Sequence, residues 1–109
     1  KFMINHLNKD LYIFLKIINE NIVATCGLQI IDYLPQCNDN GKYGHICNVY
    51  TVVEKRKQGI QKELLNEVIK FAKEKKLSEL SLCTDNKDAI ILYKKVGFYF
   101  DSTIMKLEL

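Results

Sequence analysis

The chain has 109 residues, of which 48% are hydrophobic and 10% aromatic, and it contains a single proline. This length and composition predict one globular domain spanning residues 1–109, with a modest core, and they exclude a disordered chain. The sixteen Lys and Arg residues are interspersed with thirteen acidic residues, so the net charge of +3 predicts no nucleic-acid partner.

The four cysteines are widely spaced and do not pair with histidines as zinc ligands do. We therefore predict no metal site and reduced thiols that serve as small hydrophobic side chains. The apolar runs are too short to cross a bilayer, and no secretory signal opens the sequence. These features together predict a cytoplasmic protein without a membrane partner.

Two apolar segments near the start, Leu11–Ile18 and Ile22–Ile31, are rich in β-branched and aromatic residues. A short polar turn joins them, which predicts an antiparallel hairpin. The next segment, Asp32–Gly44, collects Asn, Asp, Gly and Pro residues and is predicted to be a loop. A third apolar run, His45–Val53, is typical of a strand.

From Ile60 onward the apolar residues follow a helical period and predict an amphipathic helix that packs on a sheet. Leu77–Cys83 then predicts another strand. A second helix follows, with Asp85 or Asn86 as its N-cap and Gly97 as its end.

At the end of the chain, Met105, Leu107 and Leu109 alternate with charged residues, which predicts a final half-buried strand. The resulting order, two strands, a loop, strand, helix, strand, helix and strand, predicts an α/β (layered α+β) fold with a mixed central sheet. A right-handed crossover would join the parallel strands His45–Val53 and Leu77–Cys83.

The basic turn between the third strand and the first helix, read as EKRKQGIQ, has two interpretations. Gly59 would allow a close approach of the backbone, and the free amides at a helix start attract anions. Arg56, Lys57 and Lys62 add positive charge around those amides. The turn lacks the endings of a P-loop or a Rossmann turn, so neither ATP nor NAD is indicated, and it is either a phosphate cradle or a solvated basic turn.

Two motifs in this region resemble those of the GNAT superfamily of acetyl-CoA-dependent N-acetyltransferases. The first is the turn that holds the pyrophosphate of coenzyme A in that family, represented here by Arg56, Lys57, Gln58, Gly59, Ile60 and Gln61. The second is matched by Asn86, Ala89, Leu92, Tyr93, Lys95, Gly97 and Phe98. The motifs occur in the family's order, and the resemblance covers His45 to about Phe98.

The resemblance implies that acetyl-CoA is the cosubstrate and that its acetyl group passes to a primary amine of a small molecule or a protein. It implies that the backbone of Val49, Tyr50 and Thr51 binds the thioester and pantetheine part, as the turn binds the pyrophosphate. Asn86 would bond to the cofactor or cap its helix. Tyr93 would be the general acid for the leaving thiolate, or else a core tyrosine.

The sequence departs from the family pattern in three places. Gln61 stands where the family prefers Gly or Ala, which is acceptable if the glutamine points outward. Neither Cys47 nor Asn48 supplies the acid that many relatives carry on this strand, so His45, a water chain and unassisted attack all stay open as routes for the amine proton. The N-terminal elements are short or missing, as in a truncated domain, a minimal family member or a domain completed by a second subunit.

Two further predictions concern the binding of the amine acceptor and the assembly of the protein. The loop Asp32–Gly44 would contact the amine, with Asp32 and Asp39 attracting a cation. A homodimer would cover an apolar sheet face formed by Leu11, Ile13, Leu15 and Ile17. The alternative function is a non-catalytic module on the same fold, which binds acyl-CoA or a protein partner.

Overall fold

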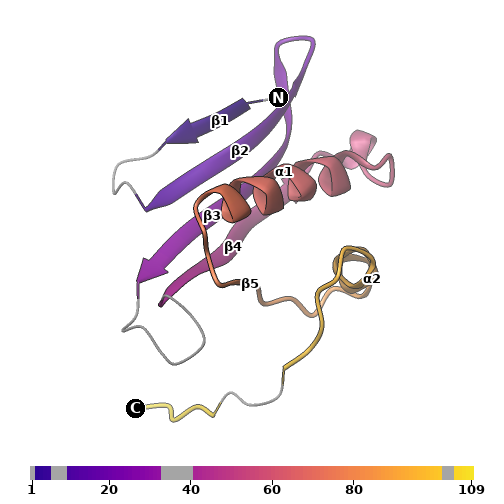
Figure 1. Ribbon diagram of the computed structural model, residues 1–109. Coiled ribbons are helices and arrows are strands. Elements are labelled where there is room, and N and C mark those ends of the chain that lie inside the picture. The colour runs from indigo at the N-terminus through magenta and orange to yellow at the C-terminus, as the bar shows by residue number, and fades with distance from the viewer. Residues whose placement is uncertain (1, 6–9, 33–40, 102–104) are drawn as a thin grey trace.

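The computed structural model describes residues 2–5, 10–32, 41–101 and 105–109. Within them the chain forms one five-stranded sheet with the strands in sequence order, and two α-helices (Figure 1). The strands are β1 (Phe2–Asn5), β2 (Leu11–Ile18), β3 (Asn21–Asp32), β4 (Lys42–Thr51) and β5 (Glu79–Ser81). The first four strands are antiparallel and β5 is parallel to β4, so the predicted mixed α/β sheet is confirmed.

The β2–β3 hairpin is confirmed, and its turn is as short as the polar residues predicted. Asn19 and Glu20 both have positive φ, at 51° and 67°, as the two central residues of a type I′ turn do. The strand β1 was not predicted from the sequence. It pairs with β2 in the register Phe2↔Leu15 and extends the sheet by one strand.

The segment after β4 differs from the prediction in its boundaries. β4 begins at Lys42 rather than His45 and ends at Thr51, because Val53–Lys55 turn into a 3-10 helix, η1. The first helix, α1 (Ile60–Glu74), begins where predicted. The predicted strand Leu77–Cys83 is reduced to the three residues of β5, and the second helix, α2, spans Lys87–Lys95.

The core lies on one face of the sheet, which α1 crosses, while α2 lies on the β5 side (Figure 1). The periodicity of two in the strands and of 3.6 in α1 places apolar side chains at this single interface. The strands contribute Tyr12, Phe14, Ala24, Cys26, Leu28 and Ile46, and the helices contribute Leu64, Leu65, Val68 and Tyr93. The Lys16 Nζ to Glu63 Oε1 ion pair, at 2.9 Å, links β2 to α1 outside this core.

The predicted C-terminal strand is wrong for the residues that the structure describes. Residues 105–109 have no strand partner, and their apolar side chains are almost fully exposed, Met105 at 96% and Leu107 at 84%. Alternation alone does not form a strand, because the backbone needs a neighbouring edge to pair with.

The predicted loop Asp32–Gly44 and the predicted apolar sheet face both differ in part from the structure. Residues 33–40 of the predicted loop, including Asp39, lie outside the described residues, and the loop is shorter at its end because β4 begins at Lys42. Leu15, expected on an open face, is only 6% exposed. The homodimer stays a prediction.

Candidate functional site

A β-bulge divides β4 into two parts. The pairing between β3 and β4 shifts so that Asn48 and Val49 together lie opposite Cys26. Asn48 has a φ of 51°, a conformation that asparagine tolerates better than most residues. The Thr25 hydroxyl donates a 2.7 Å hydrogen bond to the Asn48 carbonyl, which fixes the bulge in place.

Beside the bulge, β4 loses its other neighbour. Its parallel pairing with β5 covers only Tyr43, Gly44 and His45. His45 and Ser81 form the last pair, and their side chains are joined by a 3.0 Å hydrogen bond between Nδ1 and Oγ. Among the described residues no strand lies along the β5 side of β4 from Cys47 to Thr51. This length of strand edge is therefore available for an extended ligand.

The basic turn is built to present backbone amides. Lys57 and Gly59 both have positive φ, at 62° and 80°, which turns successive peptide groups into the concave arrangement that binds anions. Gly59 is the N-cap of α1 and offers no side-chain cap, and the first helical hydrogen bond runs from Glu63 N to Gly59 O. The preceding amides, those of Ile60, Gln61 and Lys62, have no partner within the helix.

The space in front of this turn is open. A Cβ placed on Gly59 would meet no atom within 4 Å, and Lys57 and Gln58 are exposed. Amides, a helix N-terminus and lysine side chains form a donor set suited to a phosphate or pyrophosphate group. Of the two interpretations of the turn, the geometry favours the phosphate cradle.

Two side chains of the turn hold its shape. The Arg56 Nε donates a 2.9 Å hydrogen bond to the Thr51 carbonyl, and its guanidinium lies 5.7 Å from the centre of the Tyr50 ring. The Gln58 side chain donates to the Glu54 carbonyl at 2.9 Å. These contacts connect the cradle to the end of β4.

Gln61 does not point outward, and this part of the sequence interpretation is wrong. Its Nε2 donates to the Thr51 hydroxyl at 3.0 Å and to the carbonyls of Thr25 and Tyr50 at 3.3 Å. The side chain turns inward because three acceptors on β3 and β4 lie within reach of the first turn of α1. Its Oε1 is the one buried side-chain polar atom without a partner among the described residues.

Asn86 is the N-cap of α2, as one of its two predicted roles required. Its Oδ1 accepts a 3.0 Å hydrogen bond from the backbone amide of Ala89. The backbone amide of Asn86 donates a 3.2 Å hydrogen bond to the Thr84 hydroxyl. The cap fixes where α2 begins. The role of Asn86 in binding a cofactor stays a prediction.

The hydrogen bonds at the C-terminus of α2 fix the position of Tyr93. The Phe98 amide donates to the Tyr93 carbonyl and the Gly97 amide to the Lys94 carbonyl, which is the Schellman pattern, with Gly97 at a φ of 113°. The Phe98 ring packs against Tyr93 at 5.7 Å between centroids. The backbone and one aromatic contact therefore fix the tyrosine side chain in position.

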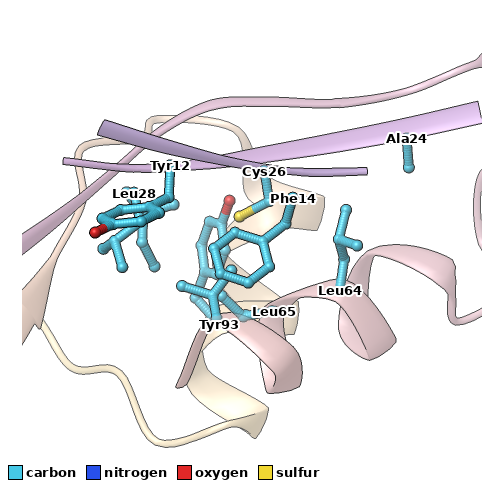
Figure 2. Close-up of a cluster of buried hydrophobic side chains, with 10 residues drawn as sticks. Tyr12, Phe14, Ala24, Cys26, Leu28, Leu64, Leu65 and Tyr93 are labelled. Carbon is cyan, nitrogen blue, oxygen red and sulfur yellow. The ribbon is translucent and has the colours of Figure 1, made fainter. Parts of the chain in front are cut away.

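The Tyr93 ring is only 7% exposed, and its hydroxyl points to the sheet, beside the Cys26 sulfur (Figure 2). Burial raises the pKa of Tyr93, and the neighbouring Cys26 adds to the effect. Burial also raises the pKa of Cys26 to about 12, with a contribution from Cys47. Because Cys26 is the residue opposite the bulge, the hydroxyl lies under the part of β4 that has no β5 beside it.

Sequence reasoning missed the residues that shape this site. Asn48, Thr25 and Cys26 form the bulge and the contact with Tyr93, and none was predicted to take part. One sequence feature does indicate the bulge, since an asparagine inside a run of β-branched and aromatic residues is unfavourable in a regular strand.

The model of the acetyltransferase (GNAT) family matches residues 2–98. The chain belongs to the GNAT acetyltransferase family. A comparison with curated proteins finds no match. Over the residues that the structure describes, no helix is long and apolar enough to cross a membrane, and no group of three His, Cys, Asp or Glu residues could hold a metal ion.

Several solved structures share this GNAT fold. A predicted acetyltransferase from Clostridium acetobutylicum, solved with acetyl-CoA, has 30% identity and a TM-score of 0.84, over 93% of this chain and 66% of its own. A GCN5-related N-acetyltransferase from Ralstonia eutropha has 20% identity and a TM-score of 0.81, over 93% and 67%. Glucosamine-6-phosphate N-acetyltransferase from Arabidopsis thaliana has 21% identity and a TM-score of 0.74, over 91% and 67%. The chain thus spans about two thirds of the length of these relatives.

Proposed function

We propose that this GNAT domain is an N-acetyltransferase that uses acetyl-CoA to acetylate a primary amine of a small molecule or peptide. The observation that carries the proposal is the juxtaposition of an open anion cradle, at Lys57 to Lys62, with a bulged and one-sided strand end at Asn48–Thr51. One part suits a pyrophosphate and the other an extended amide-containing chain, and coenzyme A contains both groups.

The residues present fit this cosubstrate. The amides of Ile60, Gln61 and Lys62 and the side chain of Lys57 would hold the pyrophosphate, and the backbone of Val49 with that of Tyr50 and Thr51 would bond to the pantetheine amides. Acetyl-CoA supplies an activated acyl group as a thioester. The Clostridium relative, which was solved with acetyl-CoA, supports the same choice.

Tyr93 is proposed as the acid that protonates the departing thiolate. A general acid must carry its proton when the reaction begins, and a tyrosine hydroxyl does so at neutral pH. Burial raises the pKa of Tyr93, which favours the same protonated form. Its position beneath the bulge, next to Cys26, places the proton on the helix side of β4. The role of Asn86 would be to fix the start of α2 and with it the position of Tyr93.

Two measurements in sequence test the proposal. Calorimetric titration of the wild-type chain with coenzyme A should show binding, and absence of binding would overturn the assignment. Consumption of acetyl-CoA and release of the coenzyme A thiol should then rise with at least one member of a panel of polyamines, aminoglycosides, amino acids and peptide N-termini. Tight binding of coenzyme A with no turnover on any amine would instead favour the non-catalytic module.

A further inference from the structure

The side chain of Gln61 connects the two parts of the proposed site, which are otherwise on different elements. Its backbone belongs to the first turn of α1, where the unpaired amides lie, while its amide group reaches Tyr50 and Thr51 at the bulged end of β4. We propose that Gln61 is a positioning residue that sets the distance between the pyrophosphate cradle and the acyl-binding strand. This inference rests on the proposed function.

The contacts of the Gln61 amide show which segments it fixes. Its Nε2 lies 3.0 Å from the Thr51 hydroxyl and 3.3 Å from the Tyr50 carbonyl, both on β4, and 3.3 Å from the Thr25 carbonyl on β3. Thr25 is also the residue whose hydroxyl holds the bulge at Asn48. The Gln61 side-chain amide therefore joins α1 to both β3 and β4 where regular pairing of the two strands resumes after the bulge, at Thr25 and Tyr50.

The strand end needs such a connection because it has few others. Beyond His45 no described strand lies on the β5 side of β4, and α1 packs mainly against β3. Besides Gln61, Arg56 links the turn to the end of β4, through its hydrogen bond to the Thr51 carbonyl and the contact of its guanidinium with the Tyr50 ring. Without Gln61 the strand end would be free to shift relative to α1 on its open side.

The side-chain carbonyl of Gln61 indicates that a contribution to the stability of the fold does not by itself explain why glutamine occupies this position. Its Oε1 is buried and has no partner among the described residues, and a buried acceptor without a donor lowers the stability of the folded chain. The amide orientation is set by three acceptors around Nε2, so rotating the group would not satisfy both ends. A methionine of similar shape removes the unpaired oxygen together with the positioning bonds.

The experiment compares whole coenzyme A with its two parts. Affinities for coenzyme A, for adenosine 3′-phosphate 5′-diphosphate and for pantetheine are measured on wild type and Gln61→Met, with Gln29→Met as the matched control on an exposed position of β3. We expect Gln61→Met to weaken coenzyme A binding at least tenfold and each fragment less than threefold. Fragments do not require a fixed distance between the two parts, whereas the joined molecule does.

Melting temperatures of the same proteins complete the test. We expect a melting temperature for Gln61→Met within a few degrees of wild type or above it. Gln61→Ala serves in its place if the methionine variant does not fold. Unchanged coenzyme A affinity in a folded variant overturns the role of Gln61 and leaves the proposed function intact. Equal losses for coenzyme A and one fragment also overturn it, since they indicate a simple ligand contact. A wild-type chain that binds no coenzyme A overturns both.

Discussion

The two ends of β4 differ although they belong to one strand. Lys42–His45 runs between β3 and β5 and is paired on both sides, whereas Asn48–Thr51 is bulged and paired with β3 alone. The first part has the environment of a core strand, with Gly44 buried between its two neighbours. The second has exposed backbone next to an anion cradle. Loss of one neighbour converts a structural strand into a binding edge, so substitutions in the two parts should affect different measurements.

The largest effect is expected at Tyr93, whose hydroxyl lies under the bulged part. Tyr93→Phe keeps the ring that packs against Phe98 and removes the proposed acid. We expect kcat to fall about 10²- to 10⁴-fold, with little change in KM for acetyl-CoA. Steady-state rates with an accepting amine and the melting temperature are measured on the same preparation.

If Tyr93 is only a core residue, the result is different. The variant would then keep its kcat and lose about 1 kcal/mol of stability with the hydroxyl. Near wild-type turnover, under conditions where chemistry limits the rate, would remove Tyr93 from the mechanism.

The second effect concerns the cradle beside the bulged part. Gly59→Val places a β-branched residue at a φ of 80°, where such residues are strained, and its side chain extends into the open space in front of the amides. The dissociation constant for coenzyme A should rise at least tenfold by calorimetry. A folded variant with unchanged affinity would contradict the assignment of the cradle.

The paired part of β4 should respond in stability instead. A Cβ at Gly44 would lie 2.7 Å from Leu80 Cδ2 and 2.8 Å from Leu28 Cδ1, so Gly44→Ala forces core side chains to move. We expect a loss of about 1 to 3 kcal/mol in urea unfolding. Affinity for coenzyme A should stay within threefold of wild type, and a selective loss of affinity would show that the two parts are not separable.

The smallest effect is in the alkaline range and tests the burial of the Cys26 thiol, which lies beside Tyr93. Burial raises the pKa of Cys26 from 9.0 to about 12, so the unfolded chain loses this proton at a lower pH than the folded one. The stability tied to this thiol is present below pH 9 and is lost as the pH rises toward 12. Between pH 9 and 10 the wild type should lose about 1 kcal/mol more than Cys26→Ala in the free energy of unfolding. Parallel curves for the two proteins would show that the thiol is not desolvated.

Much of the fold could be predicted because the residues that determine it are neighbours in the sequence. Asn19 and Glu20 close a hairpin between two β-branched runs, Ile60 to Ala72 repeat with a helical period, and Asn86 and Gly97 delimit α2 through local hydrogen bonds. The basic turn Arg56–Gln61 and the second motif, from Asn86 to Phe98, were also sufficient to indicate the family. In each case the decisive interactions lie within a few residues.

What only the tertiary structure decided depends on partners far along the chain. The bulge at Asn48 needs Thr25 on β3, and the direction of Gln61 follows from acceptors on two strands. β5 pairs over three residues although its sequence predicts seven, and the alternating residues after Met105 find no edge to pair with among the described residues. Strand pairing and side-chain direction are set by which distant backbone groups come within hydrogen-bonding reach, and a local pattern in the sequence does not contain that distance.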